Sequence, residues 1–389
     1  MTSATEIKDP KKARREVCFA LITVIISTLF CLLLAEYGLR WYQQSINNSS
    51  AGDPGLLRYH AQLGWTLTPS WQGQHQHHDF NVQYNINKYG FRGDESIDLQ
   101  SNTRRRIAFV GDSFSFGLGV EDEDTFTAQL NRLHPEIEFL NLSVPGYSTD
   151  QQLLLIENRL SMFQPDEIIL MIYLANDLLD NMLPYPLQAE QAKPFFVLDE
   201  NQQLVLRNVP TPKEMKPAKL QSMTLNTVIF GDQLKKFESN SLFEDSQLLQ
   251  RILPHKARAD KETVFKILDE RLIEQKRLMK ALVQRIKIHT SNRGHQFKLG
   301  LLSGQSFILT PDSYSAYFQD YIRLFLKELG AELNVQVIDI ADLMREIKTA
   351  KSNSWFHPNE GHLTKEGHLV VSKILTNALQ QELRETKSH

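Results

Sequence analysis

Cysteine is scarce in this 389-residue chain, and so is concentrated positive charge. Its two cysteines, Cys18 and Cys31, fall within one apolar stretch, which excludes a disulfide framework. The formal net charge is only −3, and beyond the first residues the only basic run is Arg-Arg-Arg at 104–106. Because binding to a nucleic-acid backbone needs a concentrated cationic surface, we expect no nucleic-acid partner.

Patterns of metal ligands are also lacking. His75, His77 and His78 lie close together, but their spacing matches no known ligand set and no cysteine or acidic residues support them. We interpret them as strand or loop residues, and we expect neither a metal nor a cofactor. The pattern Gly-x-Ser-x-Gly is absent around Ser113, because Ser115 occupies its last position, and this argues against the nucleophile elbow of α/β-hydrolases.

A long uncharged run stands near the N-terminus. Residues 17–35 span roughly 19 positions, or about 30 Å as a helix, which is enough to cross a bilayer. A buried core helix should have a polar face, and this run has only the small hydroxyls of Thr23, Ser27 and Thr28. A cleaved signal peptide is the alternative, but the run is long for one and Leu33-Leu34-Ala35 matches a cleavage site poorly.

The charges on either side of this run predict its orientation. Five cations precede it within residues 8–15, whereas Arg40 is the only nearby cation that follows. By the positive-inside rule, residues 1–16 form a cytoplasmic tail and residues 17–36 a transmembrane helix. Everything after residue 36 is then exported.

The remaining chain divides by pattern. Residues 37–103 are rich in Gly, Asn, Gln and aromatics, and we interpret them as a spacer of short strands and turns. Residues 104–384 alternate buried-strand runs with helical stretches, which is typical of βαβ units and a parallel sheet covered on both faces. The expected strands are 106–110, 138–143, 167–173, 297–303 and 335–340. The predicted fold is therefore a three-layer α/β/α domain with a five-stranded, flavodoxin-like parallel sheet.

An insertion at about 181–296 separates the third and fourth strands. It begins with a predicted hairpin around 199–201, and its residues 214–260 have no clear periodicity. Apolar residues then recur every three or four positions from Val264 to Ile286, which predicts one long amphipathic helix that ends near Gly294.

Reactive residue types follow the strand ends. Ser113, Gly146 and Asn176 each lie three residues past one of the first three strands, and His362 follows the last strand. Ligands of open parallel sheets bind at this edge, so we expect the four to meet there. Separately, Gly146 is explained as a turn glycine, Asn176 as a helix cap and His362 as a surface histidine.

Together these residues suit acyl transfer. A histidine can take the proton of a serine hydroxyl and so activate it as a nucleophile. The backbone N–H groups of Ser113 and Gly146 and the amide of Asn176 can then hold the oxyanion.

Four blocks of this sequence resemble the SGNH (GDSL-like) hydrolases, and they occur in the family's order over about residues 104–382. These blocks are FVGDSFSFGLGVEDEDTF, NLSVPGYSTDQQ, YLANDLLDN and NEGHLTKEGHLVVSKIL. The resemblance implies Ser113 as nucleophile, Gly146 and Asn176 in the oxyanion hole, and a histidine of the last block as base. YNINKYGFRG and the end of the apolar run are similar to membrane-tethered bacterial members, which implies an inner-membrane anchor and a periplasmic catalytic domain.

The chain departs from the family pattern at three places. Leu174 stands where the third block normally has glycine, and Asn359 stands where the last block normally has the aspartate of the triad. Glu360 is the candidate for that acid, with a backbone carbonyl as the alternative. Finally, His357 and His368 compete with His362, which we favour as the base because Glu360 lies close upstream.

Three functional hypotheses follow. The first is an esterase that removes acyl groups, with acetyl esters on envelope or extracellular glycans as the expected substrate from location and family analogy. The second is a polysaccharide O-acetyltransferase that uses the same residues. The third, from another class, is a non-catalytic glycan-binding envelope protein, although loss of Ser113, Asn176 or His362 would have favoured it and all three are present.

Overall fold

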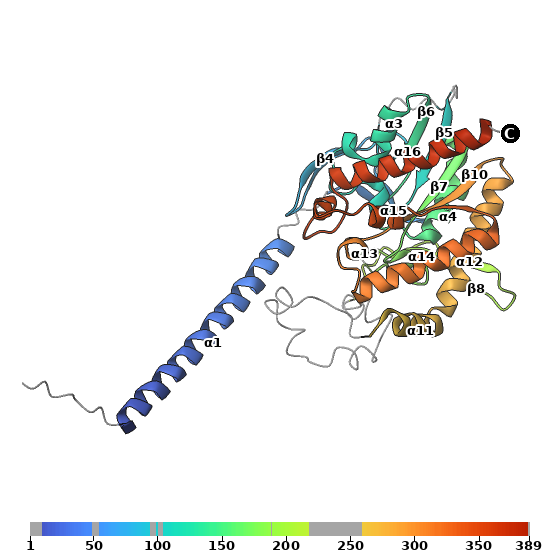
Figure 1. Cartoon of the computed structure of the whole chain (residues 1–389). Coiled ribbons are helices and arrows are strands. Elements are labelled where there is room, and N and C mark those ends of the chain that lie inside the picture. The colour runs from blue at the N-terminus through green and yellow to red at the C-terminus, as the bar shows by residue number, and fades with distance from the viewer. Residues whose placement is uncertain are drawn as a thin grey trace, which may run out of the picture. The chain divides into compact units, whose positions relative to one another are not determined.

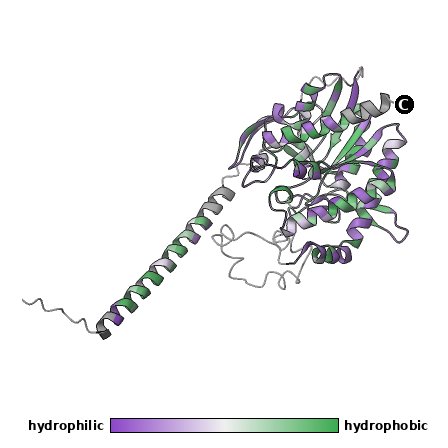
Figure 2. Cartoon of the chain, in the orientation of Figure 1, coloured by the Kyte–Doolittle hydropathy of each residue, from purple (hydrophilic) through white to green (hydrophobic). Residues whose placement is uncertain are grey.

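The computed structural model describes residues 10–48, 54–93, 99, 104–187, 189–217 and 259–387. The chain divides into two compact units, of which the first contains the helix α1 (Pro10–Asn48) and the second the sheet. Within α1, residues Arg14–Trp41 reach a mean hydropathy of 2.8 and are long and apolar enough to cross a membrane. Figure 2 shows hydrophobic residues along most of this helix, and their side chains are exposed.

The second unit is built on five parallel strands. In spatial order they are β11 (Gln336–Ile338), β10 (Gln296–Leu302), β7 (Glu167–Tyr173), β5 (Arg105–Val110) and β6 (Ile137–Asn141). Numbered along the chain, this is the order 2-1-3-4-5 of flavodoxin-like folds. The predicted fold class is confirmed.

Helices cover both faces of this sheet (Figure 1). One face carries α3 (Phe126–Leu133) and α16 (Lys365–Lys387), which pack together. The other carries α4 (Thr149–Arg159), α12 (Ile273–Ser291) and α14 (Tyr314–Leu333). Smaller helices complete the layers: α13 (Gln305–Leu309), α15 (Ile340–Glu346) and the 3₁₀ turns η1 (Asp122–Asp124), η2 (Leu160–Phe163) and η4 (Ser352–Trp355).

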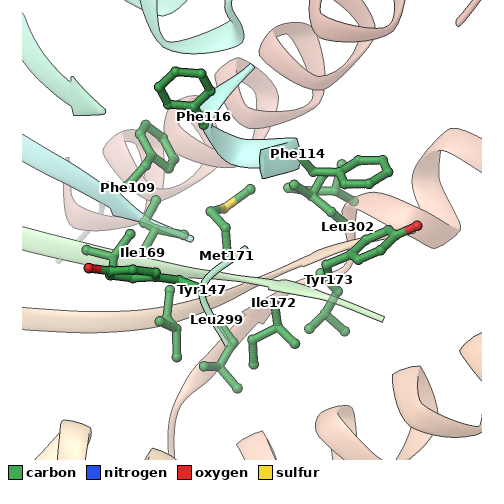
Figure 3. Packing of buried hydrophobic residues seen from close by; sticks show 14 of the residues in the cluster. Phe109, Phe114, Phe116, Tyr147, Ile169, Met171, Ile172, Tyr173, Leu299 and Leu302 are labelled. Atoms are coloured by element: carbon green, nitrogen blue, oxygen red, sulfur yellow. The ribbon is translucent and has the colours of Figure 1, made fainter. Parts of the chain in front are cut away.

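The core lies between these layers. Figure 3 shows side chains of β5, β7 and β10 meeting aromatic rings from the segments that follow β5 and β6. All seven residues of β7 are buried, which explains why this strand is a continuous apolar run rather than an alternating one. Burial on both faces makes β7 a rigid support for the loop that follows it.

The long amphipathic helix predicted from Val264 onward is two helices. The chain leaves helical geometry at Leu272 (φ −101°, ψ 19°), between α11 (Lys261–Arg271) and α12. The change of direction lets α11 pack on α14 while α12 packs on α4, so both apolar faces are buried. One straight helix with the same periodicity would reach only one of these neighbours.

Three hairpins accompany the sheet. Residues 54–93 contain β1 (Leu57–His60) with β2 (Gly64–Leu67), and β3 (Gln72–Gln76) with β4 (Asn81–Asn85). The insertion contributes β8 (Phe195–Leu198) with β9 (Leu204–Arg207), around the turn predicted at 199–201. Residues 54–93 belong to the same compact unit as the sheet, and Trp65 and Tyr84 are fully buried in its core.

Candidate active site

The turn after β5 presents Ser113 at the edge of the sheet. Ser113 begins the short helix α2 (Ser113–Phe116), whose N-cap Asp112 accepts a hydrogen bond from the Phe114 N–H at 3.0 Å. Residues in the first turn of a helix have no intrahelical acceptor for their N–H groups. Among the described residues the Ser113 N–H donates to no acceptor, so it is free to bind a ligand oxygen.

Ser113, His362 and Glu360 form a continuous chain of hydrogen bonds. The Ser113 Oγ lies 2.6 Å from the His362 Nε2, and the His362 Nδ1 lies 2.6 Å from the Glu360 Oε1. The other Glu360 oxygen accepts from the His362 backbone N–H at 3.0 Å. Gly361 between them has a φ of +86°, and this left-handed residue allows the chain to fold back on itself.

The surroundings of the imidazole keep a negative charge beside it. Although burial raises the pKa of Glu360, the hydrogen bonds and charge of His362 outweigh this and hold it below its ordinary value. Glu360 is therefore ionised at neutral pH. Burial raises the pKa of Asp112 to about 6, against the charge of His362. The ring of Phe114 lies 4.4 Å from that of His362 and limits its movement.

The competing histidines make other contacts. The His357 Nε2 lies 3.1 Å from the Gly119 carbonyl oxygen, and its ring packs on Phe80. The His368 Nδ1 accepts from the Phe126 N–H at 3.2 Å, and burial lowers its pKa to about 3. Of the three histidines considered, the structure brings only His362 to Ser113.

Gly146 and Asn176 follow the two strands that flank β5. Gly146 has a φ of +79°, and a Cβ there would lie 3.1 Å from a ring carbon of Trp65, so both conformation and space require glycine. Its N–H donates to no acceptor among the described residues. Asn176 occupies the N-cap position of α5 (Asp177–Asp180) but makes no capping hydrogen bond, which removes the simple explanation of this residue as a cap.

Residues 54–93 contact the loops that carry Ser113, Gly146 and Glu360, and the sequence interpretation of this segment as a spacer did not predict these contacts. The Trp65 Nε1 donates to the Pro145 carbonyl oxygen at 2.9 Å, beside Gly146. The Asp79 carboxylate accepts from the backbone N–H groups of Asn359 and Glu360, each at 2.8 Å. The hairpins therefore hold the loops that carry Gly146 and Glu360.

Arg92 supports the nucleophile turn from the same segment. Its guanidinium donates to the carbonyl oxygens of Phe116 (3.1 Å), Gly117 (2.5 Å) and Val120 (2.5 Å), and its Nε lies 2.6 Å from Asp122. The Phe116 and Gly117 carbonyls lie at the C-terminal end of α2, where carbonyl oxygens have no partner within the helix. The signal in the sequence was the motif YNINKYGFRG, in which an arginine follows three aromatic residues.

A small pocket of about 220 Å³ opens beside His362. Phe114 and Tyr173 line it. Their rings are stacked with centroids 4.0 Å apart, and Figure 3 shows the two side by side. Ser306, Ser315 and Gln319 line it with hydroxyl and amide groups: the two serine Oγ atoms lie 2.8 Å apart, and the Gln319 Nε2 donates to the Ser306 Oγ at 2.9 Å. Within the described ranges no cluster of His, Cys, Asp or Glu has the geometry of a metal site.

A fully buried ion pair joins the insertion to the first turn of α4, which follows the loop of Gly146. Lys193 and Asp150 pair with no exposure of either side chain. Asp150 also accepts from the Ser148 hydroxyl at 2.8 Å and from the Gln151 N–H at 2.7 Å. Burial raises the pKa of Asp150, and the charge of Lys193 opposes that rise.

We expect Lys193→Met to destabilise the protein by about 3–5 kcal/mol, because it leaves a buried carboxylate without its cation. Without Lys193 the pKa of Asp150 rises further above its unfolded value, so the stability deficit grows as the pH rises above that unfolded value. Thermal unfolding in detergent, followed by tryptophan fluorescence, measures both effects.

Two matched variants control this prediction. Lys193→Met/Asp150→Asn removes the unpaired charge and should recover much of the loss. Lys280→Met breaks an ion pair with Glu332 whose side chains are 44% and 55% exposed, and should change stability by less than about 1 kcal/mol. Equal losses in Lys193→Met and Lys280→Met would contradict the expected energetic role of burial.

No family model matches this chain, and no curated protein matches its sequence. Among solved structures, this chain is similar to a lipase/acylhydrolase from Enterococcus faecalis, with 13% identity and a TM-score of 0.34 over 72% of this chain and 96% of that one. It is similar to a catalytic mutant of Axe2, an acetylxylan esterase from Geobacillus stearothermophilus, with 13% identity and a TM-score of 0.38 over 72% of this chain and 95% of that one. It is also similar to a member of the lipolytic protein G-D-S-L family from Veillonella parvula DSM 2008, with 14% identity and a TM-score of 0.34 over 70% of this chain and 97% of that one.

Proposed function

We propose that this chain is a serine esterase of SGNH type, with Ser113 as nucleophile, His362 as general base and Glu360 as the acid that orients it. The observation that carries the proposal is the unbroken hydrogen-bond chain from the Ser113 Oγ through both nitrogens of His362 to Glu360. A serine hydroxyl is a weak nucleophile until a base within hydrogen-bond distance takes its proton. The carboxylate beside Nδ1 keeps the proton on that nitrogen and leaves Nε2 free to accept.

The reaction then proceeds in two halves. The Ser113 Oγ attacks the ester carbonyl while its proton passes to the His362 Nε2, and the imidazolium is stabilised by Glu360. The tetrahedral oxyanion is held by the N–H groups of Ser113 and Gly146 and the Asn176 amide. His362 gives its proton to the leaving alcohol, and a water activated by the same nitrogen releases the acid from Ser113.

The pocket beside His362 supports a small polar substrate. Its volume of about 220 Å³ is below the range of about 300–1,000 Å³ typical for drug-sized ligands. Hydroxyl and amide groups in its lining suit the alcohol of a sugar better than a long acyl chain, because a sugar can exchange hydrogen bonds with them whereas an apolar chain would only remove them from water. We therefore propose O-acetyl groups of envelope or extracellular glycans as the substrate class.

The apolar helix supports a location at the membrane. A single span with five cations before it and Arg40 after it favours a cytoplasmic N-terminus and an exported esterase. We propose the bacterial inner membrane as the site of the anchor and the periplasm as that of the catalytic unit. Tethering would hold the site near envelope glycans.

A polysaccharide O-acetyltransferase is the second candidate, favoured by the same polar pocket, which can seat a sugar hydroxyl as acceptor in place of water. The two functions share the acyl-serine and differ only in what accepts the acyl group. A non-catalytic glycan-binding protein needs neither half of the reaction.

The full chain in detergent, assayed on p-nitrophenyl acetate and p-nitrophenyl octanoate, tests the proposal. We expect hydrolysis of the acetyl ester, with kcat/KM at least about tenfold above that of the octanoyl ester, because burying the octanoyl chain against the polar lining of the pocket takes hydroxyl and amide groups out of water at a cost of about 1–3 kcal/mol each. Acetyl transfer to an added oligosaccharide with little release of acetate would favour the transferase. If neither ester is hydrolysed and no acetyl group is transferred, both enzyme hypotheses fail and the non-catalytic glycan-binding protein is the hypothesis that remains.

A further inference from the structure

The side-chain amide of Asn176 is fixed by a single hydrogen bond. Its Nδ2 donates to the Asp180 Oδ2 at 2.9 Å. Its Oδ1 is buried and has no hydrogen-bond partner among the described residues. An unpaired buried carbonyl oxygen costs about 1–3 kcal/mol, so the amide keeps this orientation only because the bond from Nδ2 outweighs that cost.

Asp180 is held rigidly in place for this contact. It is the last residue of α5, is fully buried, and uses its second oxygen to accept from the Leu187 N–H at 2.8 Å. Burial raises the pKa of Asp180 to about 6, against the opposing effects of the Leu187 N–H, the charge of Lys193 and the Asn176 amide. The carboxyl is therefore ionised at neutral pH.

An ionised carboxylate can only accept hydrogen bonds, so it distinguishes the two ends of the amide. The Asn176 nitrogen faces Asp180, and the flipped amide would bring its oxygen against a negative charge. The nitrogen carries two hydrogens, of which Asp180 takes one and the other is left for a ligand.

We propose that Asp180 is a positioning residue for the oxyanion hole, because its carboxylate selects the orientation of Asn176 that offers an N–H to the reacting oxygen. This rests on the proposed function, in which Asn176 stabilises the oxyanion. In the opposite orientation Oδ1 would face the developing negative charge and raise the barrier. The loss of one donor of this kind lowers kcat by a factor of about 10²–10³.

The same contact gives the insertion a role at the site. Leu187, which anchors Asp180, and Lys193, whose charge favours its ionised form, both belong to the insertion. The insertion therefore acts on the oxyanion hole through Asp180, without contributing a residue that touches the substrate carbonyl.

A double-mutant cycle on the full chain in detergent tests this, with p-nitrophenyl acetate as substrate. We expect Asp180→Asn to lower kcat by about 10–100-fold with KM within about twofold, because the loss concerns the transition state alone. Asn176→Ala should lower kcat by about 10²–10³-fold. In the Asn176→Ala background, Asp180→Asn should change kcat by less than about twofold, because there is no amide left to orient.

Asp177→Asn is the matched control. Asp177 is also fully buried and accepts a backbone bond, from the Tyr173 N–H at 3.1 Å, and its carboxylate makes no bond to the Asn176 side chain. A structural loss of this kind should be the same factor in both backgrounds. If Asp180→Asn does not fold, as judged by thermal unfolding, Asp180→Ser replaces it with the same expected pattern.

The outcomes separate the two proposals. Loss from Asp180→Asn by the same factor in both backgrounds, or no loss in the wild-type background, overturns the positioning role of Asp180. Full activity of Asn176→Ala also overturns the positioning role of Asp180, but the esterase proposal stands as long as the wild-type protein is active. An inactive wild type overturns the esterase itself.

Discussion

Replacing Ser113 with alanine is expected to lower kcat/KM for p-nitrophenyl acetate by about 10⁴-fold or more, the largest effect of any single substitution in this chain. The reason is geometric. The Ser113 Oγ is the atom 2.6 Å from the His362 Nε2, and no other hydroxyl of the described residues hydrogen-bonds to this nitrogen. His362 can then only activate water, without an acyl-enzyme and without the advantage of a fixed nucleophile.

A fluorophosphonate probe tests the same atom independently of any substrate. After reaction with the full chain, peptide mapping should find one modified serine, Ser113, and the Ser113→Ala protein should take up no label. Ser115→Ala is the matched control, since Ser115 is two residues away, fully buried and has an Oγ without a hydrogen-bond partner among the described residues. It should keep both labelling and activity. Label on another serine, or unchanged turnover in Ser113→Ala, would reject the proposed nucleophile.

The fold was predictable from the sequence because a parallel sheet buried on both faces leaves a simple pattern. After its first residue, the run EIILMIY at 167–173 has no polar face, and all of its residues are buried in β7. Because parallel strands run in the same direction, the residues that follow each strand lie at one edge of the sheet. That rule predicted that Ser113 lies near the last block, where the structure has His362.

The supports of the site were not predictable in the same way. Asp79 and Glu360, which are hydrogen-bonded, lie 281 positions apart in the sequence, and Trp65 and Pro145 lie 80 positions apart. Neither contact follows from periodicity, because both come from short two-stranded hairpins that do not pair with the five-stranded sheet. The break at Leu272 was missed for a related reason: periodicity reports which residues face the core and is insensitive to a change in helix direction.

Glu360 departs from the aspartate that the last block normally carries one position earlier, and its role is tested by a pair of substitutions. Glu360→Gln is expected to lower kcat by about 10²–10⁴-fold with little effect on KM. The Gln side chain can donate a hydrogen bond to the His362 Nδ1, which moves the ring proton to Nε2 and removes the acceptor for the Ser113 hydroxyl. It also removes the charge that stabilises the imidazolium.

Asn359→Ala is the control, since Asn359 occupies the position of the usual acid. Its side chain turns away from the imidazole and donates to the Asp79 Oδ1 at 2.7 Å. The loss of one exposed hydrogen bond, worth about 1 kcal/mol at most, should change kcat by less than about fivefold. Equal losses in the two variants, or none in either, would remove Glu360 from the triad. A large loss in Glu360→Gln alone would mean that the acid of the triad stands one position later here than in the family pattern. The left-handed turn at Gly361 and the two backbone N–H groups that donate to Asp79 make this position possible.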